Sequence, residues 1–173
     1  ALKRKLALIN KYANTSKTIL DIGCGTGEFL ITARKNNWNT LGVEINDEAR
    51  NKSSKKNITT YKFIKEVKSS QFNIITLWHV LEHLKDLNGT ITKISSLLDT
   101  DGTLIIAVPN YKSYDANYYK EYWAAYDTPR HLWHFSKKSI STIFKNHNLK
   151  VVRTLPMYFD SYYVSLLSEK YKT

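Results

Sequence analysis

The feature that most constrains the fold is a run of three alternating glycines directly after an apolar segment. Gly23, Gly25 and Gly27 follow the apolar stretch Thr18 to Ile22, and Glu28 to Asn36 then carries its apolar residues at helical spacing. This order predicts a strand, a tight turn and a helix. Because three glycines cost conformational entropy that a plain turn does not require, we expect the turn to bring backbone N–H groups against a ligand.

The spacing of the glycines argues against a pyrophosphate ligand. The dinucleotide fingerprint has glycines at relative positions 1, 3 and 6, whereas the sixth position here is Glu28. That carboxylate would repel a pyrophosphate, and the Gly-Lys-Ser/Thr ending of a P-loop is absent. A nicotinamide-dependent oxidoreductase is therefore only a minor alternative.

Two carboxylates accompany the turn. Glu44 lies nineteen residues after Gly25, at the end of the expected strand Thr40 to Ile45, where a carboxylate can accept both hydroxyl hydrogens of a ribose. Asp21, in the first strand, adds negative charge where a cationic sulfonium or ammonium group would fit, although it could also only cap the turn. Together the two residues indicate an adenosine ligand without phosphates.

Strand and helix patterns alternate along the rest of the chain. The expected strands are 18–22, 40–45, one within 58–64, 72–78, 103–108 and 150–155. The expected helices are 2–13, 28–36, 47–54, 88–98, 139–146 and 161–169. Such alternation predicts an α/β, Rossmann-like, doubly wound and mostly parallel sheet flanked by helices. With 173 residues, the chain is expected to form a single domain over residues 1–173.

Residues 110–136 form an aromatic insert that we interpret as a lid after the fifth strand. The insert holds six of the twelve tyrosines, and helical spacing of residues 111, 114, 118 and 122 would line up four rings as a wall for an aromatic or sugar substrate. Near its end, His131 or His134 is suited to remove a proton from an attacking hydroxyl, while Arg130 could anchor a carboxylate or phosphate. Alternatively, both histidines only pin the lid.

The segment from His79 to His83 matches the His-x-x-Glu-His string of inverted zinc proteases. It follows a buried strand instead of lying within a long helix, so we expect no metal site. His79 is instead a third candidate catalytic residue facing substrate, and His83 is expected to be structural.

Four segments resemble the class I S-adenosylmethionine-dependent methyltransferases, in the group that includes ubiquinone-biosynthesis-type O-methyltransferases. They are Leu20 to Gly27, Gly42 to Ile45, Phe72 to Leu84 and Asp101 to Asn110, in this order. The resemblance implies that Asp21, Gly23 and Gly25 hold the methionine end of the cofactor, Glu44 the ribose and Ile45 the adenine. It also places Cys24, Gly27 and Trp78 at the cofactor, with Glu66 as the nearest carboxylate for the adenine amino group. The family's sheet has seven strands, and we find six, with the terminal seventh strand absent.

The resemblance implies methyl transfer from S-adenosylmethionine to a small-molecule acceptor, with oxygen favoured, and release of S-adenosylhomocysteine. A net charge of +11 and the lysine-rich stretch Lys52 to Lys68 keep an RNA or protein methyltransferase as an alternative, but 21 Lys against 5 Arg favour a solvated surface. A non-catalytic adenosyl-ligand binding module is a further alternative. The oligomeric state is open.

Composition also bears on the compartment. Cys24 is the only cysteine, and the longest apolar run, Leu104 to Val108, is far shorter than the roughly 20 residues of a membrane span. We expect a cytoplasmic protein without a membrane span.

Overall fold

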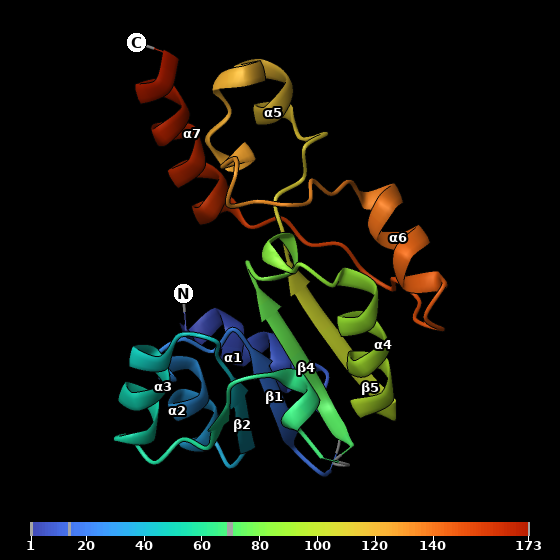
Figure 1. Ribbon diagram of the computed structural model, residues 1–173. Helices are drawn as coiled ribbons and strands as arrows, with labels where there is room; N and C mark the ends of the chain where they lie inside the picture. The colour runs from blue at the N-terminus through green and yellow to red at the C-terminus, as the bar shows by residue number, and fades with distance from the viewer. Residues whose placement is uncertain (1, 14, 69–70, 173) are drawn as a thin grey trace. The chain divides into compact units, whose positions relative to one another are not determined.

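The structure, a computed structural model that describes residues 2–13, 15–68 and 71–172, contains a five-stranded parallel sheet (Figure 1). The strands are β1 (Thr18–Ile22), β2 (Asn39–Val43), β3 (Thr60–Tyr61), β4 (Phe72–Trp78) and β5 (Leu98–Ala107), in the order β3-β2-β1-β4-β5. All neighbouring strands pair in parallel. This order confirms the Rossmann-like doubly wound fold and places the topological switch point between β1 and β4, where ligands of such sheets bind.

Helices flank the sheet because its strands are apolar on both faces. They are α1 (Leu2–Lys11), α2 (Glu28–Arg34), α3 (Asp47–Ser54) and α4 (Leu87–Leu97), with the short 3₁₀ helix η1 (Ile64–Glu66). Ile19, Leu20 and Ile74 are fully buried, as expected for central parallel strands. Ile9 of α1 and Leu30 of α2 belong to the same buried cluster as Ile19 and Ile74.

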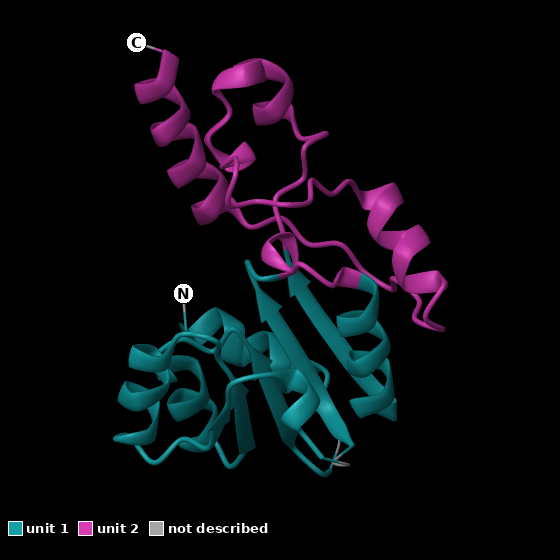
Figure 2. Cartoon of the chain, viewed as in Figure 1, with its two compact units in different colours: residues 1–80, 88–107 teal, residues 81–87, 108–173 magenta. Residues whose placement is uncertain are grey.

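The chain divides into two compact units (Figure 2). The first comprises residues 1–80 and 88–107 and holds the sheet; the second comprises residues 81–87 and 108–173. The second unit contains η2 (Leu81–His83), α5 (Tyr114–Tyr119), η3 (Lys120–Tyr122), η4 (Ala124–Tyr126), α6 (Lys137–Lys145) and α7 (Tyr158–Lys172). It has a small core of its own, formed by Ala116, Tyr119, Trp123 and Ala125. The single domain over residues 1–173 therefore stays a prediction.

The predicted strand at Lys150 to Leu155 is wrong. The described residues form five strands, and residues 150–156 have no regular secondary structure. Val151 and Val152 are exposed, Val152 to 74%. A segment with strand propensity becomes a strand only where a neighbouring strand accepts its hydrogen bonds and its side chains pack. Residues 150–155 pair with none of the described strands, and the side chains of Val151 and Val152 are not packed.

The expected tyrosine wall is also wrong. The helix α5 spans only Tyr114–Tyr119, because Lys120 takes a positive φ of 52° and ends it. Tyr114 and Tyr118 do stack, with ring centroids 6.2 Å apart, but Tyr111 precedes the helix and Tyr122 lies in η3. The helical spacing therefore aligns two rings, not four.

The remaining boundaries agree with the expected ones to within a few residues, and the two-residue strand β3 lies within the expected range 58–64. The exception is β5, which begins at Leu98 directly after α4. None of the described helices has the length and apolar character needed to cross a membrane.

Candidate functional site

The glycine turn is fastened to the end of β2. The N–H groups of Gly23 and Cys24 both donate to the carbonyl oxygen of Val43, at 2.7 and 3.1 Å. Gly23, Gly25 and Gly27 have φ values of 74°, 55° and 80°, in the left-handed region that glycine adopts without steric cost. The expectation that these N–H groups face a ligand is therefore wrong. Those of Gly23 and Cys24 hold the turn to β2, that of Gly25 donates to Oε2 of Glu44 at 2.8 Å, and that of Gly27 donates to the carbonyl oxygen of Cys24 at 3.0 Å.

The glycines have different surroundings. A Cβ atom at Gly23 would lie 2.3 Å from Cγ2 of Val80, whereas a Cβ atom at Gly25 would meet no atom within 4 Å. Gly23 is required by packing, and Gly25 faces the open side where a ligand can approach. Cys24 is 8% exposed, and burial raises the pKa of its thiol to about 12, so the thiol is not a nucleophile.

Glu44 connects the end of β2 to the turn. Its Oε2 accepts the N–H of Gly25 at 2.8 Å, and its Oε1 accepts the N–H of Asn46 at 2.9 Å. A carboxylate has about four acceptor positions, so two remain for the hydroxyls of a ribose. The next residue, Ile45, is 69% exposed and offers an apolar surface to a flat ring such as adenine.

Asp21 lies in the middle of the sheet, paired in register with Gly42 of β2 and Thr76 of β4. It is 3% exposed, and Oγ1 of Thr76 donates to its Oδ1 at 2.5 Å. Burial raises the pKa of Asp21 to about 7, although the Thr76 hydroxyl and the charge of Lys5 oppose the rise. A ligand cation beside Asp21 would stabilise its ionised form.

Trp78 and Glu66 have partners of their own. The indole of Trp78 packs edge-to-face on Phe29, at 5.9 Å between ring centroids, and Nζ of Lys5 lies 4.3 Å from the Trp78 ring centroid. The Glu66 carboxylate accepts the N–H groups of Lys62 and Phe63, at 3.0 and 3.4 Å, and so caps its own turn. Their roles at the cofactor, and those of Gly27 and Cys24, stay predictions.

One of the three candidate catalytic histidines lies in the first unit, and the other two lie in the second. His79 belongs to the first unit, is exposed, and donates its backbone N–H to Ala107 at 3.0 Å, with a φ of 58°. In the second unit, Nδ1 of His131 lies 2.8 Å from the carbonyl oxygen of Ala125, and Nε2 of His134 lies 3.0 Å from that of Tyr126. Each of these two rings is thus held through one nitrogen and has the other available for chemistry.

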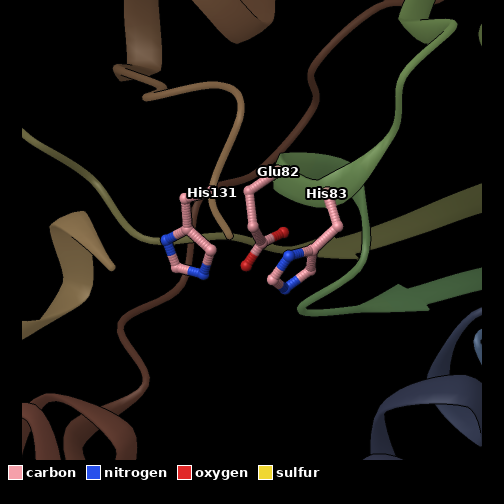
Figure 3. Close-up of side chains that lie close together, drawn as sticks. All are labelled: Glu82, His83 and His131. Carbon is pink, nitrogen blue, oxygen red and sulfur yellow. The ribbon is translucent and has the colours of Figure 1, made fainter. Parts of the chain in front are cut away.

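The His-x-x-Glu-His string does not form the zinc-protease arrangement. The short helix η2 begins at Leu81, so His79 and His83 do not lie one turn apart on a helix. His83 instead lies against His131, with ring centroids 4.7 Å apart, and Glu82 lies between them (Figure 3). Sequence reasoning missed this cluster, because the two motifs that form it are far apart in the chain and only the fold brings them together.

Comparison with known proteins decides the family. A family model described as a methyltransferase domain matches residues 1–154. The chain belongs to this family. A comparison with curated proteins finds no match.

Solved structures share the fold of this methyltransferase domain. One is the magnesium protoporphyrin IX methyltransferase of Synechocystis with bound S-adenosylhomocysteine, at a TM-score of 0.71 and 17% identity, covering 89% of this chain and 74% of that one. A S-adenosylmethionine-dependent methyltransferase of Archaeoglobus fulgidus matches at a TM-score of 0.67 and 18% identity, covering 99% and 86%. A possible histamine N-methyltransferase of Thermotoga maritima matches at 0.67 and 14% identity, covering 87% and 71%.

These findings confirm that the methyltransferase domain has the class I fold that its sequence resembles, and S-adenosylmethionine is the cofactor that family and fold indicate. The ubiquinone-biosynthesis subgroup stays a prediction.

Acidic partners neutralise much of the lysine-rich stretch of the methyltransferase domain. Of its six lysines, Lys52 pairs with Glu48 at 2.6 Å, Lys56 with Glu28 at 2.5 Å and Lys62 with Asp47 at 3.2 Å. At least half of the lysines in this stretch therefore have an acidic partner within the protein.

Proposed function

We propose that this methyltransferase moves the methyl group of S-adenosylmethionine to a hydroxyl of a small-molecule acceptor and releases S-adenosylhomocysteine. The observation that carries the proposal is the geometry of Glu44. Two backbone N–H groups hold its carboxylate at the end of β2, beside the open side of Gly25 and next to the exposed Ile45. These residues suit an adenosine without a pyrophosphate.

The methionine end of the cofactor is assigned to Asp21. Its pKa of about 7 means that the ammonium and sulfonium charges of the cofactor would bring the carboxyl fully to its ionised form. The transfer itself is an in-line attack of the acceptor oxygen on the sulfonium methyl carbon. Positioning and exclusion of water supply most of the acceleration.

A histidine of the second unit is proposed to take the proton of the acceptor hydroxyl. A carbonyl oxygen only accepts hydrogen bonds, so the ring nitrogen that faces it carries the proton. The neutral ring of His131 therefore has Nε2 as its acceptor, and the ring of His134 has Nδ1. His79 remains the third candidate on the first unit.

The ion-paired lysines support a small acceptor over RNA. Two of the structural neighbours also carry the names of methyltransferases that act on small molecules. The single free cysteine, Cys24, suits a cytoplasmic location.

The decisive test measures cofactor binding by calorimetry. The variant Glu44→Ala should bind S-adenosylmethionine and S-adenosylhomocysteine roughly ten to a hundredfold more weakly, on the order of 1.5–3 kcal/mol for lost charge-assisted hydrogen bonds. As the matched control, Glu48→Ala removes an exposed carboxylate of α3 that pairs with Lys52 of the same helix, and it should leave the affinity unchanged. Equal affinities of the Glu44→Ala and wild-type proteins would refute the ribose assignment.

A second measurement separates an enzyme from a binding module. Formation of S-adenosylhomocysteine is followed with a panel of small phenols, sugars and hydroxy acids, using the wild type, His131→Gln and His134→Gln. Turnover that falls with one of the two substitutions supports the proposed base. Cofactor binding without turnover on any acceptor would favour the non-catalytic module.

A further inference from the structure

Glu82, His83 and His131 form a compact group of metal-ligating side chains within the second unit. One ligand atom from each lies within 4.8 Å of the other two. Figure 3 shows the Glu82 carboxylate between the two imidazole rings. For comparison, the ligands of a tetrahedral zinc ion with bonds of 2.0–2.1 Å are about 3.3 Å apart, so an ion would need to draw these ligand atoms together by up to roughly 1.5 Å.

Hydrogen bonds to the backbone set the tautomer of both rings. Nδ1 of His83 lies 2.9 Å from the carbonyl oxygen of Arg130, and Nδ1 of His131 lies 2.8 Å from that of Ala125. Since a carbonyl only accepts, each Nδ1 carries a proton, and each neutral ring has its lone pair on Nε2. Histidines that bind metals are oriented in the same way, with the second ring nitrogen donating to a carbonyl or carboxylate.

The two segments that supply the ligands are fixed to one another. The backbone oxygen of Glu82 accepts the N–H groups of Leu132 and Trp133, at 2.8 and 3.3 Å. The indole N–H of Trp133 donates to the carbonyl oxygen of Leu84 at 2.7 Å. The backbone segments that carry the ligands are therefore brought together by the fold of the second unit, with Glu82 buried and His83 exposed.

Charge and burial favour a cation at this position. Glu82 is 1% exposed, and a buried carboxylate is stabilised by a positive ion nearby. Asp127 stands beside the group, with Oδ2 3.7 Å from Nε2 of His131, a separation too long for a hydrogen bond. The other oxygen of Asp127 accepts from Nε and Nη2 of Arg130, which holds this second carboxylate beside Nε2 of His131 and adds negative charge near the group.

We propose that this cluster binds one divalent transition-metal ion of the zinc type, through the Glu82 carboxylate and Nε2 of both His83 and His131. Two imidazoles and one carboxylate are a ligand set that zinc accepts, and three protein ligands leave a fourth position for water or an oxygen ligand. The inference goes beyond the proposed methyl transfer. It assigns His131 to the metal and leaves His134 as the candidate base of the second unit.

The test uses the full chain without cofactor, after dialysis against a chelator. Zn²⁺ is titrated by calorimetry, and Co²⁺ by visible absorption, which reports the coordination number directly. We expect one ion per chain and the intense absorption of four-coordinate Co²⁺.

Three variants and one control identify the ligands. Glu82→Gln, His83→Gln and His131→Gln should each weaken Zn²⁺ binding at least about tenfold, the scale on which even outer-shell partners act. His147→Gln, which removes a histidine outside the cluster, should have no effect. Because His83 is exposed, His83→Gln reports loss of a ligand without a risk to folding.

Zn²⁺ affinity that His83→Gln and His131→Gln leave unchanged would overturn the proposal, as would binding no tighter than millimolar. S-adenosylmethionine binding is measured on the same samples. If the protein binds S-adenosylmethionine but not Zn²⁺, only the metal site is refuted. If it binds Zn²⁺ but not S-adenosylmethionine, only the proposed function is refuted.

Discussion

Gly23 and Gly25 have the same backbone conformation but carry different constraints. Both have a positive φ, yet only Gly23 lies against another side chain, that of Val80. The sequence pattern predicts that both are required, without separating a glycine needed for packing from one needed for ligand approach. Contacts between distant segments make that distinction, because Val80 is far from the turn in the chain.

Alanine substitutions should separate the two glycines. Gly23→Ala combines a left-handed alanine with a Cβ that would lie 2.3 Å from Cγ2 of Val80, so we expect a loss of roughly 3 kcal/mol and a Tm lower by about 6–12 °C. Gly25→Ala has only the conformational cost of about 1–2 kcal/mol. Its larger effect should be on S-adenosylmethionine affinity, because the added methyl group occupies the open side. Calorimetric melting and cofactor titration of both variants check this, and a Gly25→Ala protein that binds as tightly as the wild type would contradict it.

Asp21 predicts a pH dependence with a definite sign. Its pKa is raised from 3.8 to about 7 in the folded protein, so the folded state binds more protons than the unfolded state between these values. Its contribution to the free energy of unfolding is therefore constant below about pH 4, declines as the pH rises towards 7, and is lowest above 7. Asp21→Asn should abolish this decline. Thermal melting from pH 4 to 8, with wild type and variant in parallel, measures it.

The same carboxyl should make cofactor binding depend on pH in the opposite direction. With a pKa of about 7, its ionised fraction rises about tenfold from pH 6 to pH 8, and a cationic ligand selects that form. The affinity for S-adenosylmethionine should rise by up to about the same factor, with proton release on binding. Calorimetry in buffers of different ionisation enthalpy detects the released proton. A flat affinity in the wild type would place the cofactor's charges away from Asp21.

At the scale of single residues, the sequence predicted those positions that depend on spacing between residues near one another in the chain. Glu44 could be identified because its spacing from the glycines places it at the end of the next parallel strand. The pairing of His131 with His83 could not be identified, because no local spacing relates the two residues.

Among the elements, the two sequence errors share a physical cause. The predicted strand at 150–155 and the predicted tyrosine face both relied on local propensity or periodicity. A segment forms a strand only where the edge of a neighbouring strand accepts it. A helix continues only while its residues keep helical dihedral angles, and Lys120 ends α5 with its positive φ. The strands β1 and β4, by contrast, were predicted residue for residue, because both are short, largely apolar segments rich in Ile and Leu, as expected for buried parallel strands.

The helix α7 provides a test at this scale. Ser168 is fully buried, accepts the N–H of Ala124 at 2.9 Å and donates to the carbonyl oxygen of Val164 at 2.7 Å, so its hydroxyl joins α7 to η4. Ser168→Ala leaves the Ala124 N–H without this acceptor and should cost about 1–3 kcal/mol. Ser161→Ala, which removes an exposed hydroxyl that donates to Asp115 on α5, should cost under about 0.5 kcal/mol. Hydrogen exchange of the second unit reports both, and equal exchange rates in the two variants would contradict the role of Ser168.

For the whole molecule, the net charge of +11 is less informative than it first suggests. Acidic residues pair with three lysines of the most basic stretch, which lowers the local positive charge there without changing the net charge. Lysine exceeds arginine about fourfold in the sequence. Such a surface attracts anions broadly and without planar recognition of bases.

Nucleic-acid binding should therefore be weak and dominated by salt. A fluorescent single-stranded RNA should bind with a Kd of about 10⁻⁶ to 10⁻⁴ M near physiological salt, and its affinity should fall steeply as salt increases. Fluorescence anisotropy at several salt concentrations measures this, with poly-anionic heparin as the comparison ligand. Tight binding that persists at high salt would support the RNA methyltransferase alternative.

The double attachment of Glu44 has a consequence for how such a protein changes over evolutionary time. One carboxylate both closes the glycine turn and serves as the proposed ribose acceptor. If a gene is duplicated and one protein product no longer binds the cofactor, selection for folding would still retain this glutamate. Glu44 would then persist in catalytically silent descendants, so its presence in a relative indicates an intact turn and does not by itself indicate retained catalysis.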